Sequence, residues 1–246
     1  MSENPPVQIV KAPGGVLKTA FVGGASKGIG RAVAKHLASR GVRVIACGRT
    51  KEELDSLVAE LPLIEVPGPS PIETELKTHK AFVCDLSKTA ELEDRLKGLV
   101  REMGAIDILI LNSGGPKGGP ILDASPAEFE AAMQAHLHAN HILAKMYIPG
   151  MKARGAGRII AVLSTSVKNP IPNLGVSNAT RWAVAAWAKT LAGEVAPFGI
   201  TVNMVLPGYT RTGRLEELSK AAAEKRGIEQ EKVLEEWAKA APMGRI

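Results

Sequence analysis

The chain has 246 residues, of which 45% are hydrophobic and 23% are charged, as is usual for a folded globular protein. This length and composition exclude a disordered chain, a collagen-like repeat and a small scaffold held by disulfides. The 31 lysines and arginines exceed the 25 acidic residues. The resulting net charge of +6 favours an anionic ligand, either nucleic acid or a phosphorylated small molecule.

The sequence indicates a cytoplasmic protein. Cys47 and Cys84 match no metal-binding or redox spacing, so we expect two buried thiols in a reducing compartment. The first residues show no basic segment followed by an apolar run, and no later stretch approaches roughly eighteen continuous apolar residues. We therefore expect neither a signal peptide nor a membrane span.

Strand-like and helix-like patterns alternate along most of the chain. β-branched apolar runs predict strands, and apolar residues at helical spacing predict helices. The predicted strands are 19–22, 42–47, 80–84, 107–111, 158–163 and 200–206. The predicted helices follow the glycine-rich turn at 23–30, then cover 51–61, 89–103, a long segment from 125, 177–195 and 212–241. This alternation predicts a parallel sheet in a single-domain, Rossmann-type, doubly wound α/β fold.

Two segments interrupt the alternation. Residues 62–79 contain four prolines and no periodicity, so we expect a surface loop or insertion there. Residues 114–120 form a second loop, rich in glycine and proline. Sheets of this kind bind ligands beyond the carboxyl ends of their strands, so the functional residues are expected just after strands.

Gly24, Gly28 and Gly30 lie between the first predicted strand and its helix. Glycine permits positive φ and lets backbone N–H groups approach phosphate oxygens, and the helix N-terminus adds a partial positive charge. The spacing G-x-x-x-G-x-G fits neither a P-loop nor the G-x-G-x-x-G fingerprint. In its strand–turn–helix context it predicts a dinucleotide site.

The segment GGASKGIG resembles the Thr-Gly-x-x-x-Gly-Ile-Gly loop of short-chain dehydrogenases/reductases, with Gly23 in place of the family's Thr. Segments 84–86, 111–114 and 207–212 are similar, in order, to the family's adenine-contacting Asp, its Asn-Asn-Ala-Gly segment and its Pro-Gly segment beside the nicotinamide. The resemblance covers nearly the whole chain and includes reductases of the 3-oxoacyl-carrier-protein type. It implies these cofactor-binding residues: Gly24, Ser26, Lys27, Gly28, Ile29, Gly30, Arg49, Asp85, Leu86, Asn112, Ser113, Gly114, Arg181, Pro207, Gly208, Thr210 and Thr212.

The residues after the second strand favour NADP(H) as the cofactor. No Asp or Glu is present there to accept a hydrogen bond from a ribose 2′-hydroxyl, as NAD selection normally requires. Arg49 is placed to contact a 2′-phosphate, and Lys27 could add a second charge. The alternative is that both are ordinary exposed cations.

The family's catalytic set of Asn, Ser, Tyr and Lys is only partly present. Ser164 matches the serine, whereas Ser177 takes the tyrosine position, Arg181 the lysine position and His136 the asparagine position. A serine hydroxyl is a far weaker acid than a tyrosine of lowered pKa, and an arginine is effectively never deprotonated. We expect the Arg181 fork to contact the nicotinamide ribose.

His136 is one candidate for the missing acid, because an imidazole titrates near neutral pH. The alternative is that it packs or hydrogen-bonds on its helix, as expected for His138 and His141. Tyr209 is another candidate acid, with packing beside the cofactor as the alternative. Trp182 and Trp187 are expected to pack, and no residue pair has a recognised metal-ligand spacing.

Three functions are compatible with these residues. The first is an NADP-dependent oxidoreductase that interconverts a carbonyl and an alcohol on a small organic or acyl substrate. The second is a catalytically impaired NADP-binding relative acting as a sensor or assembly partner, and the third is a reductase of a conjugated double bond. We expect a small-molecule partner, no nucleic acid, no membrane, and a homodimer or homotetramer.

The sequence divides into an N-terminal tail and one domain. We predict an N-terminal tail over 1–17 and a short-chain dehydrogenase domain over 18–246. The family continues beyond its Pro-Met-x-Arg segment, here 242–245, to a seventh strand that is missing. The chain is therefore either truncated or leaves its sixth strand as a sheet edge.

Overall fold

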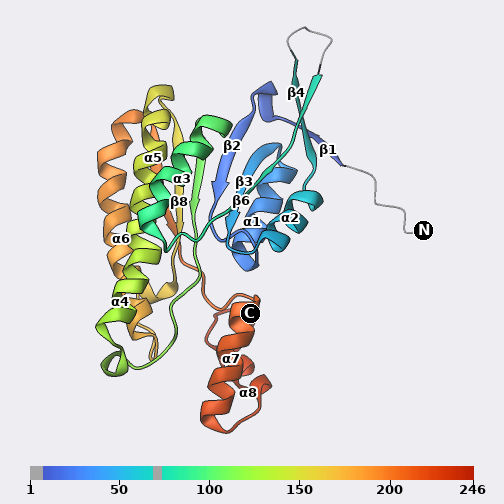
Figure 1. Cartoon of the computed structure of the whole chain (residues 1–246). Helices are drawn as coiled ribbons and strands as arrows, with labels where there is room; N and C mark the ends of the chain where they lie inside the picture. The colour runs from blue at the N-terminus through green and yellow to red at the C-terminus, as the bar shows by residue number, and fades with distance from the viewer. Residues whose placement is uncertain (1–7, 69–73) are drawn as a thin grey trace, which may run out of the picture.

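The computed structural model describes residues 8–68 and 74–246 and contains a parallel sheet between layers of helices (Figure 1). The main sheet has the strand order β6-β3-β2-β7-β8-β9, and all its strand pairs are parallel. Its strands are β2 (Lys18–Val22), β3 (Val42–Gly48), β6 (Lys80–Val83), β7 (Ile108–Leu111), β8 (Gly157–Val162) and β9 (Ile200–Val205). The prediction of a doubly wound α/β fold is confirmed. The strand order reverses between β2 and β7, and such a switch point is where ligands bind.

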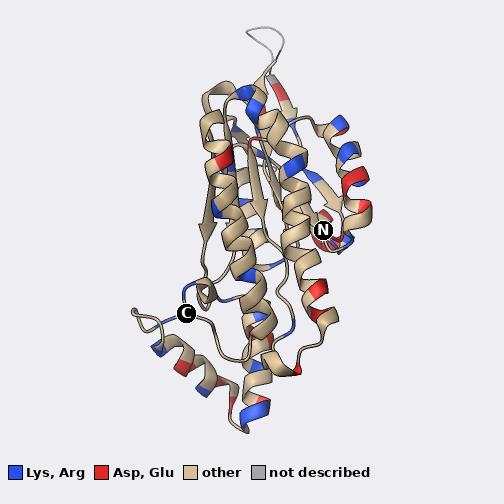
Figure 2. Cartoon of the chain, turned by 90° about the vertical axis from the view of Figure 1, so that its left-hand side faces the viewer, with Lys and Arg blue, Asp and Glu red and all other residues tan. Residues whose placement is uncertain are grey.

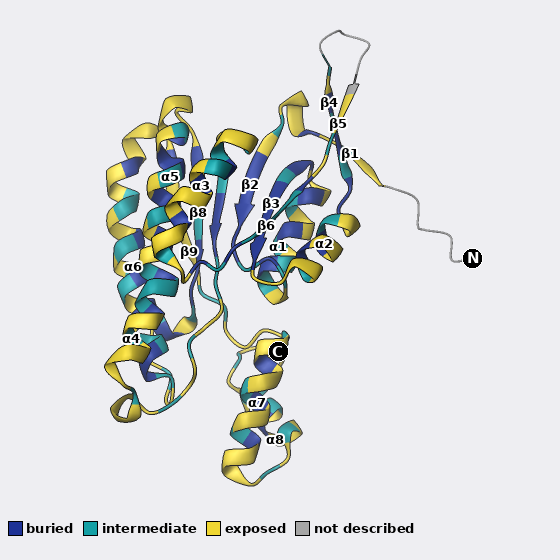
Figure 3. Cartoon of the chain, in the orientation of Figure 1, coloured by how far each residue is buried: buried dark blue, intermediate teal, exposed yellow. Residues whose placement is uncertain are grey.

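Helices bury both faces of this sheet (Figure 3). One face packs against α1 (Gly28–Ser39) and α2 (Lys51–Glu60), and the other against α3 (Thr89–Met103), α5 (Ala139–Arg154) and α6 (Gly175–Val195). The central strands are apolar on both sides because each faces a helix layer, as the sequence VRVIACG of β3 illustrates.

A small second sheet lies beside the main one. It has the order β1-β4-β5 and consists of β1 (Ile9–Lys11), β4 (Leu63–Pro67) and β5 (Thr74–Lys77). The expectation of an irregular loop over 62–79 is therefore wrong for β4 and β5, while residues 69–73 lie outside the described part. The reason is tertiary: Ile64 and Val66 of β4 form a separate small core with Ala12.

His79 joins this region to the main sheet. Its Nδ1 accepts a hydrogen bond from the Val44 backbone N–H at 2.9 Å, and its Nε2 lies 2.8 Å from the Pro62 carbonyl oxygen. The Nε2–H therefore donates to Pro62, and the ring is neutral. Burial lowers the pKa of His79, which is consistent with this state.

The long helix expected from residue 125 is interrupted. It begins with a capping box between Ser125 and Glu128 and runs as α4 (Pro126–Met133). A π-helical turn over Gln134–His138 then leads into α5. Such turns are rare and are frequent at functional sites.

The C-terminal helical segment also divides into two. α7 (Gly213–Arg226) ends at Gly227, which has a φ of +63°, and α8 (Gln230–Lys239) follows. Both helices lie beyond the carboxyl end of the sheet (Figure 1). None of the helices in the described part of the chain has the length and hydrophobicity of a membrane span.

Candidate active site

The turn between β2 and α1 forms a backbone cradle whose shape requires glycine. Gly24 and Gly28 have φ values of +58° and +54°, which side chains rarely allow. A Cβ on Gly30 would lie 2.2 Å from the Gly24 carbonyl oxygen, so the first turn of α1 packs directly on the loop. No side chain of the described residues caps the N-terminus of α1, so its N–H groups and dipole face this cradle and suit a pyrophosphate.

Two later segments meet the cradle. Asn112 follows β7, and its Nδ2 donates to the Gly23 carbonyl oxygen at 3.1 Å. Thr212 precedes α7, and its Cγ2 would lie 3.4 Å from a Cβ on Gly28. The loops after three different strands thus converge, as the carboxyl-end rule predicts.

The other predicted residues of the turn have local partners. Ser26 packs on the end of β3, since a Cβ on Gly48 would lie 2.2 Å from its Oγ. The exposed Lys27 forms a 3.3 Å ion pair with Glu53 on α2. Ile29 packs against the core beneath α1 and α2.

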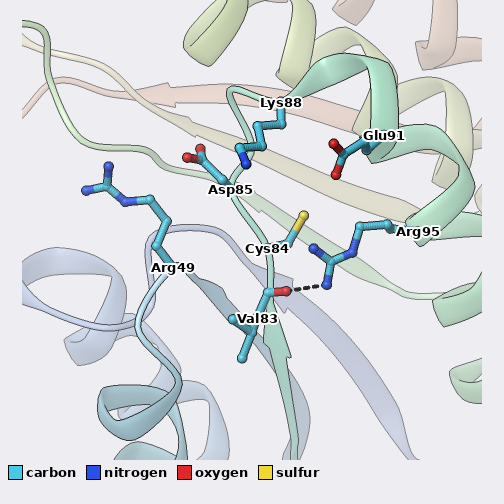
Figure 4. Close-up of a pocket in the computed structure, with 7 residues that line it drawn as sticks. All are labelled: Arg49, Val83, Cys84, Asp85, Lys88, Glu91 and Arg95. Carbon is cyan, nitrogen blue, oxygen red and sulfur yellow. Dashed lines mark hydrogen bonds between the residues drawn. The ribbon is translucent and has the colours of Figure 1, made fainter.

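Arg49 and Asp85 line a cleft of about 300 Å³ at the ends of β3 and β6 (Figure 4). Lys88 and Arg95 contribute two further cations, and Arg95 donates to the Val83 carbonyl oxygen. The three cations outnumber the two acidic residues of the cleft, Asp85 and Glu91, and suit a nucleotide phosphate beside its adenosine.

Asp85 remains ionised at the mouth of this cleft. Burial opposes its ionisation, but hydrogen bonds from the Ser87 hydroxyl and N–H, together with Arg49 and Lys88, lower its pKa. Leu86, the next residue, is buried in the core and anchors the segment.

His136 lies in the π-helical turn and contacts Ser113, with 2.7 Å between its Nδ1 and the Ser113 Oγ. The His136 side chain is only 3% exposed. Burial, reinforced by the charge of Arg181, lowers the pKa of His136 to about 3. His136 therefore does not take up a proton near neutral pH, which the sequence-based hypothesis of an acid with the ordinary pKa of 6.5 requires.

Arg181 projects from α6 into the same region and is 91% buried, since only 9% of it is exposed. Its Nη1 donates to the Val162 carbonyl oxygen at 2.9 Å, whereas its Nε has no partner among the described residues. Burial, with the nearby charge of Arg214, lowers the pKa of Arg181 to about 10, so it is still a cation at neutral pH.

Ser164 and Ser177 are both half-buried. Ser164 follows β8, two residues beyond the carbonyl that Arg181 binds, and its Oγ accepts from the Ser166 N–H at 3.1 Å. Ser177 lies one helical turn before Arg181 on α6. The structure thus places the four candidate catalytic residues on three adjoining elements and brings His136 and Arg181 close together.

The segment after β9 is held by short contacts. Pro207 accepts from the Thr165 N–H at 3.2 Å, and the hydroxyls of Thr210 and Thr212 donate to carbonyl oxygens within the segment. Gly208 lies beside Thr165. The Tyr209 ring stacks on Trp237 of α8, with 4.7 Å between centroids, which supports its packing role.

Arg214 is a residue of this region that sequence reasoning missed. It lies in the first turn of α7, and its Nη2 donates to the Pro116 carbonyl oxygen at 2.8 Å. This contact joins α7 to the loop after β7, which contains the exposed Gly114. No sequence signal distinguishes Arg214 from the other charges of that helix.

A glycine cradle at a topological switch point, with cations beyond the carboxyl end of β3, is typical of a dinucleotide-binding α/β protein. The short chain dehydrogenase family model matches residues 18–223. The chain belongs to the short-chain dehydrogenase/reductase family, as the resemblance predicted.

The chain is similar to dehydrogenases and ketoreductases of this family. A dehydrogenase/reductase SDR family member 4 from Sus scrofa is 32% identical over 196 residues, and the chain spans 66% of that relative and 79% of its own length. A putative ketoacyl reductase from Streptomyces coelicolor is 30% identical over 197 residues, covering 79% of this chain and 71% of the relative. The structure of a variant actinorhodin polyketide ketoreductase with NADPH has a TM-score of 0.78 and 26% identity, covering 93% of this chain and 84% of that one.

Proposed function

We propose that this protein is an NADP-dependent oxidoreductase that interconverts a carbonyl and an alcohol on a small organic or acyl substrate. The observation that carries the proposal is the glycine cradle, combined with Arg49 at the carboxyl end of β3. The cradle has the backbone shape for a pyrophosphate, and Arg49 stands where a carboxylate would select NAD. The similarity to a ketoreductase solved with NADPH supports the same cofactor.

The chain's own residues position and polarise the reactants. NADPH, when bound, supplies the hydride. The Ser164 hydroxyl can donate a hydrogen bond to the substrate oxygen, and the neutral Ser113–His136 pair offers a second hydroxyl nearby. Arg181 stabilises negative charge but does not deliver its proton at neutral pH.

The cofactor assignment is tested by calorimetric titration with NADPH and NADH. We expect NADPH to bind at least about tenfold more tightly. Arg49→Ala should remove most of that difference, whereas Lys51→Ala, which removes a nearby charge paired with Asp55, should preserve it. Equal affinities in the parent protein, or an equal effect of Arg49→Ala on both cofactors, would show that the assignment is wrong.

A second candidate is an NADP-binding sensor or assembly partner without turnover. Ser177 and Arg181, in place of the family's Tyr and Lys, favour it because neither is a good proton donor. NADPH oxidation over a panel of ketones, aldehydes and conjugated enones separates these functions. Binding without oxidation supports the sensor, and oxidation confined to enones supports reduction of a double bond.

A further inference from the structure

Two guanidinium groups from different helices converge on Gly115. A Cβ placed on this glycine would lie 3.8 Å from Arg181 Nη2 and 4.0 Å from Arg214 Nη2, with no nearer atom. Arg181 comes from α6 and Arg214 from α7, and Gly115 belongs to the loop that follows β7. The exposed Gly115 therefore has two cations beside its Cβ position, and it follows Ser113 by two residues in the same loop.

The charge of Arg181 has no acidic partner among residues 8–68 and 74–246. The nearest charge that acts on it is another cation, Arg214. A buried charge is costly unless it is paired, and the unpartnered Nε leaves one donor unsatisfied. An anion beside Arg181 Nη2 at Gly115 would pair this charge.

The two donors that border Gly115 determine which anion fits. They are Arg181 Nη2 and Arg214 Nη2, one from each guanidinium group. Two N–H donors set side by side match the two oxygens of a carboxylate. Arg214 is half-exposed, and its contacts with Glu217 at 3.3 Å and with the Pro116 carbonyl oxygen at 2.8 Å hold its guanidinium beside this loop.

We propose that Arg181 and Arg214 bind a carboxylate of the substrate in the space at Gly115, so that the substrates are carbonyl compounds bearing a carboxylate, such as oxo acids. This inference rests on the proposed oxidoreductase function. The carboxylate binds to the loop that contains Ser113, so it orients the carbonyl toward the Ser113 hydroxyl.

Binding to the NADP⁺-loaded protein provides a test that does not require turnover. The probes are pyruvate, benzoate and 3-hydroxybutyrate, each titrated by calorimetry beside its amide. We expect at least one acid to bind about tenfold more tightly than its amide. Arg214→Gln should reduce this preference severalfold, whereas Lys220→Gln, an exposed charge removed from the same helix, should retain it.

A second pair of variants places a side chain of the protein itself in the proposed carboxylate site. Gly115 is not in the left-handed backbone region, so it accepts a side chain without strain. Gly115→Asp supplies an internal carboxylate and should raise the melting temperature while abolishing the preference for acids. Gly115→Asn has nearly the same shape without the charge, and its melting temperature should stay near that of the parent.

Acids that bind no better than their amides, or a preference unchanged in Arg214→Gln, overturn the proposal. The Arg181→Lys variant gives a further test. The proposal fails if this variant binds NADPH more weakly in the absence of substrate and also binds acids and amides more weakly by the same factor. That result would show that the Arg181 guanidinium contacts the cofactor ribose and not the substrate carboxylate. If the protein still reduces neutral ketones, the proposed oxidoreductase function holds even when the carboxylate proposal fails. Failure of the carboxylate proposal can therefore be distinguished from failure of the proposed function.

Discussion

Ser164 is the one member of the family's catalytic set that the chain retains. In the proposed chemistry its hydroxyl donates the hydrogen bond that polarises the substrate oxygen. Ser164→Ala removes a hydrogen bond that strengthens as charge develops on the substrate oxygen. We expect turnover to fall on the order of 100-fold while NADPH affinity stays unchanged. Steady-state rates and calorimetry on the same preparations measure both quantities. Unchanged turnover would place the chemistry elsewhere in the site.

His136 makes stability depend on pH because the fold holds its ring neutral. The folded pKa is about 3, below the ordinary value of 6.5, so the unfolded chain binds a proton first as the pH falls. The free energy of unfolding therefore decreases between pH 6.5 and about 3, by up to about 1.4 kcal/mol per pH unit for this one group.

Urea unfolding of the parent and of His136→Gln across this range measures the effect. The variant should show a shallower dependence on pH, whatever its absolute stability. His79 contributes in the same direction, so some dependence should persist in the variant. A similar change of slope in His36→Gln, whose ring is exposed, would contradict the assignment to His136.

At the level of the secondary-structure elements, the contact between α1 and the glycine turn leaves no room for a methyl group. Gly30→Ala would place its Cβ 2.2 Å from the Gly24 carbonyl oxygen, so the turn must shift and the cradle must open. We expect NADPH affinity to fall at least about tenfold.

Gly98→Ala on α3 is the matched control. A Cβ there meets nothing within 4 Å, and alanine is the better helix former, so this variant should gain about 0.5–1 kcal/mol of stability with no change in binding. If Gly30→Ala and Gly98→Ala bind NADPH equally well, the glycine turn is not rigid.

The sequence alone predicts the main sheet well, because most of its strands are apolar runs and β2, β7 and β9 are followed by glycine-containing turns. It does not predict β4, since a five-residue run that follows Pro62 and ends with Pro67 acquires its regular form only by pairing with β1 and β5. Arg214 is hidden for a similar reason. Its contact with Pro116 spans 98 residues of sequence and exists only after α7 has folded across the loop.

The whole molecule presents one side, formed by α5 and α6, with few charges (Figure 2). A shallow groove of about 330 Å³ between these helices has an apolar floor that includes Ile148, Leu191 and Val195, and Lys145, Lys152 and Glu194 also line it. Such a surface is typical of association between identical subunits, and it supports the expectation of a homodimer or homotetramer.

Leu191→Glu places a charge in this groove and should yield monomers, which light scattering after size exclusion measures. Lys189→Glu also introduces an acidic residue on α6, at an exposed position outside the groove, and should keep the parent's mass. A parent protein that is already monomeric would contradict the prediction.

The three tryptophans give the protein optical reporters in separate places. Trp237 stacks on Tyr209 next to the Pro-Gly segment, Trp182 donates its indole N–H to the Ser166 carbonyl oxygen near Ser164, and Trp187 lies edge-on to His141 beside the groove. Emission from single-tryptophan variants will therefore resolve movement of α8, changes near the reacting groups and contact between subunits as three independent signals. Substrate entry and self-association can thus each be followed in its own variant without an added label.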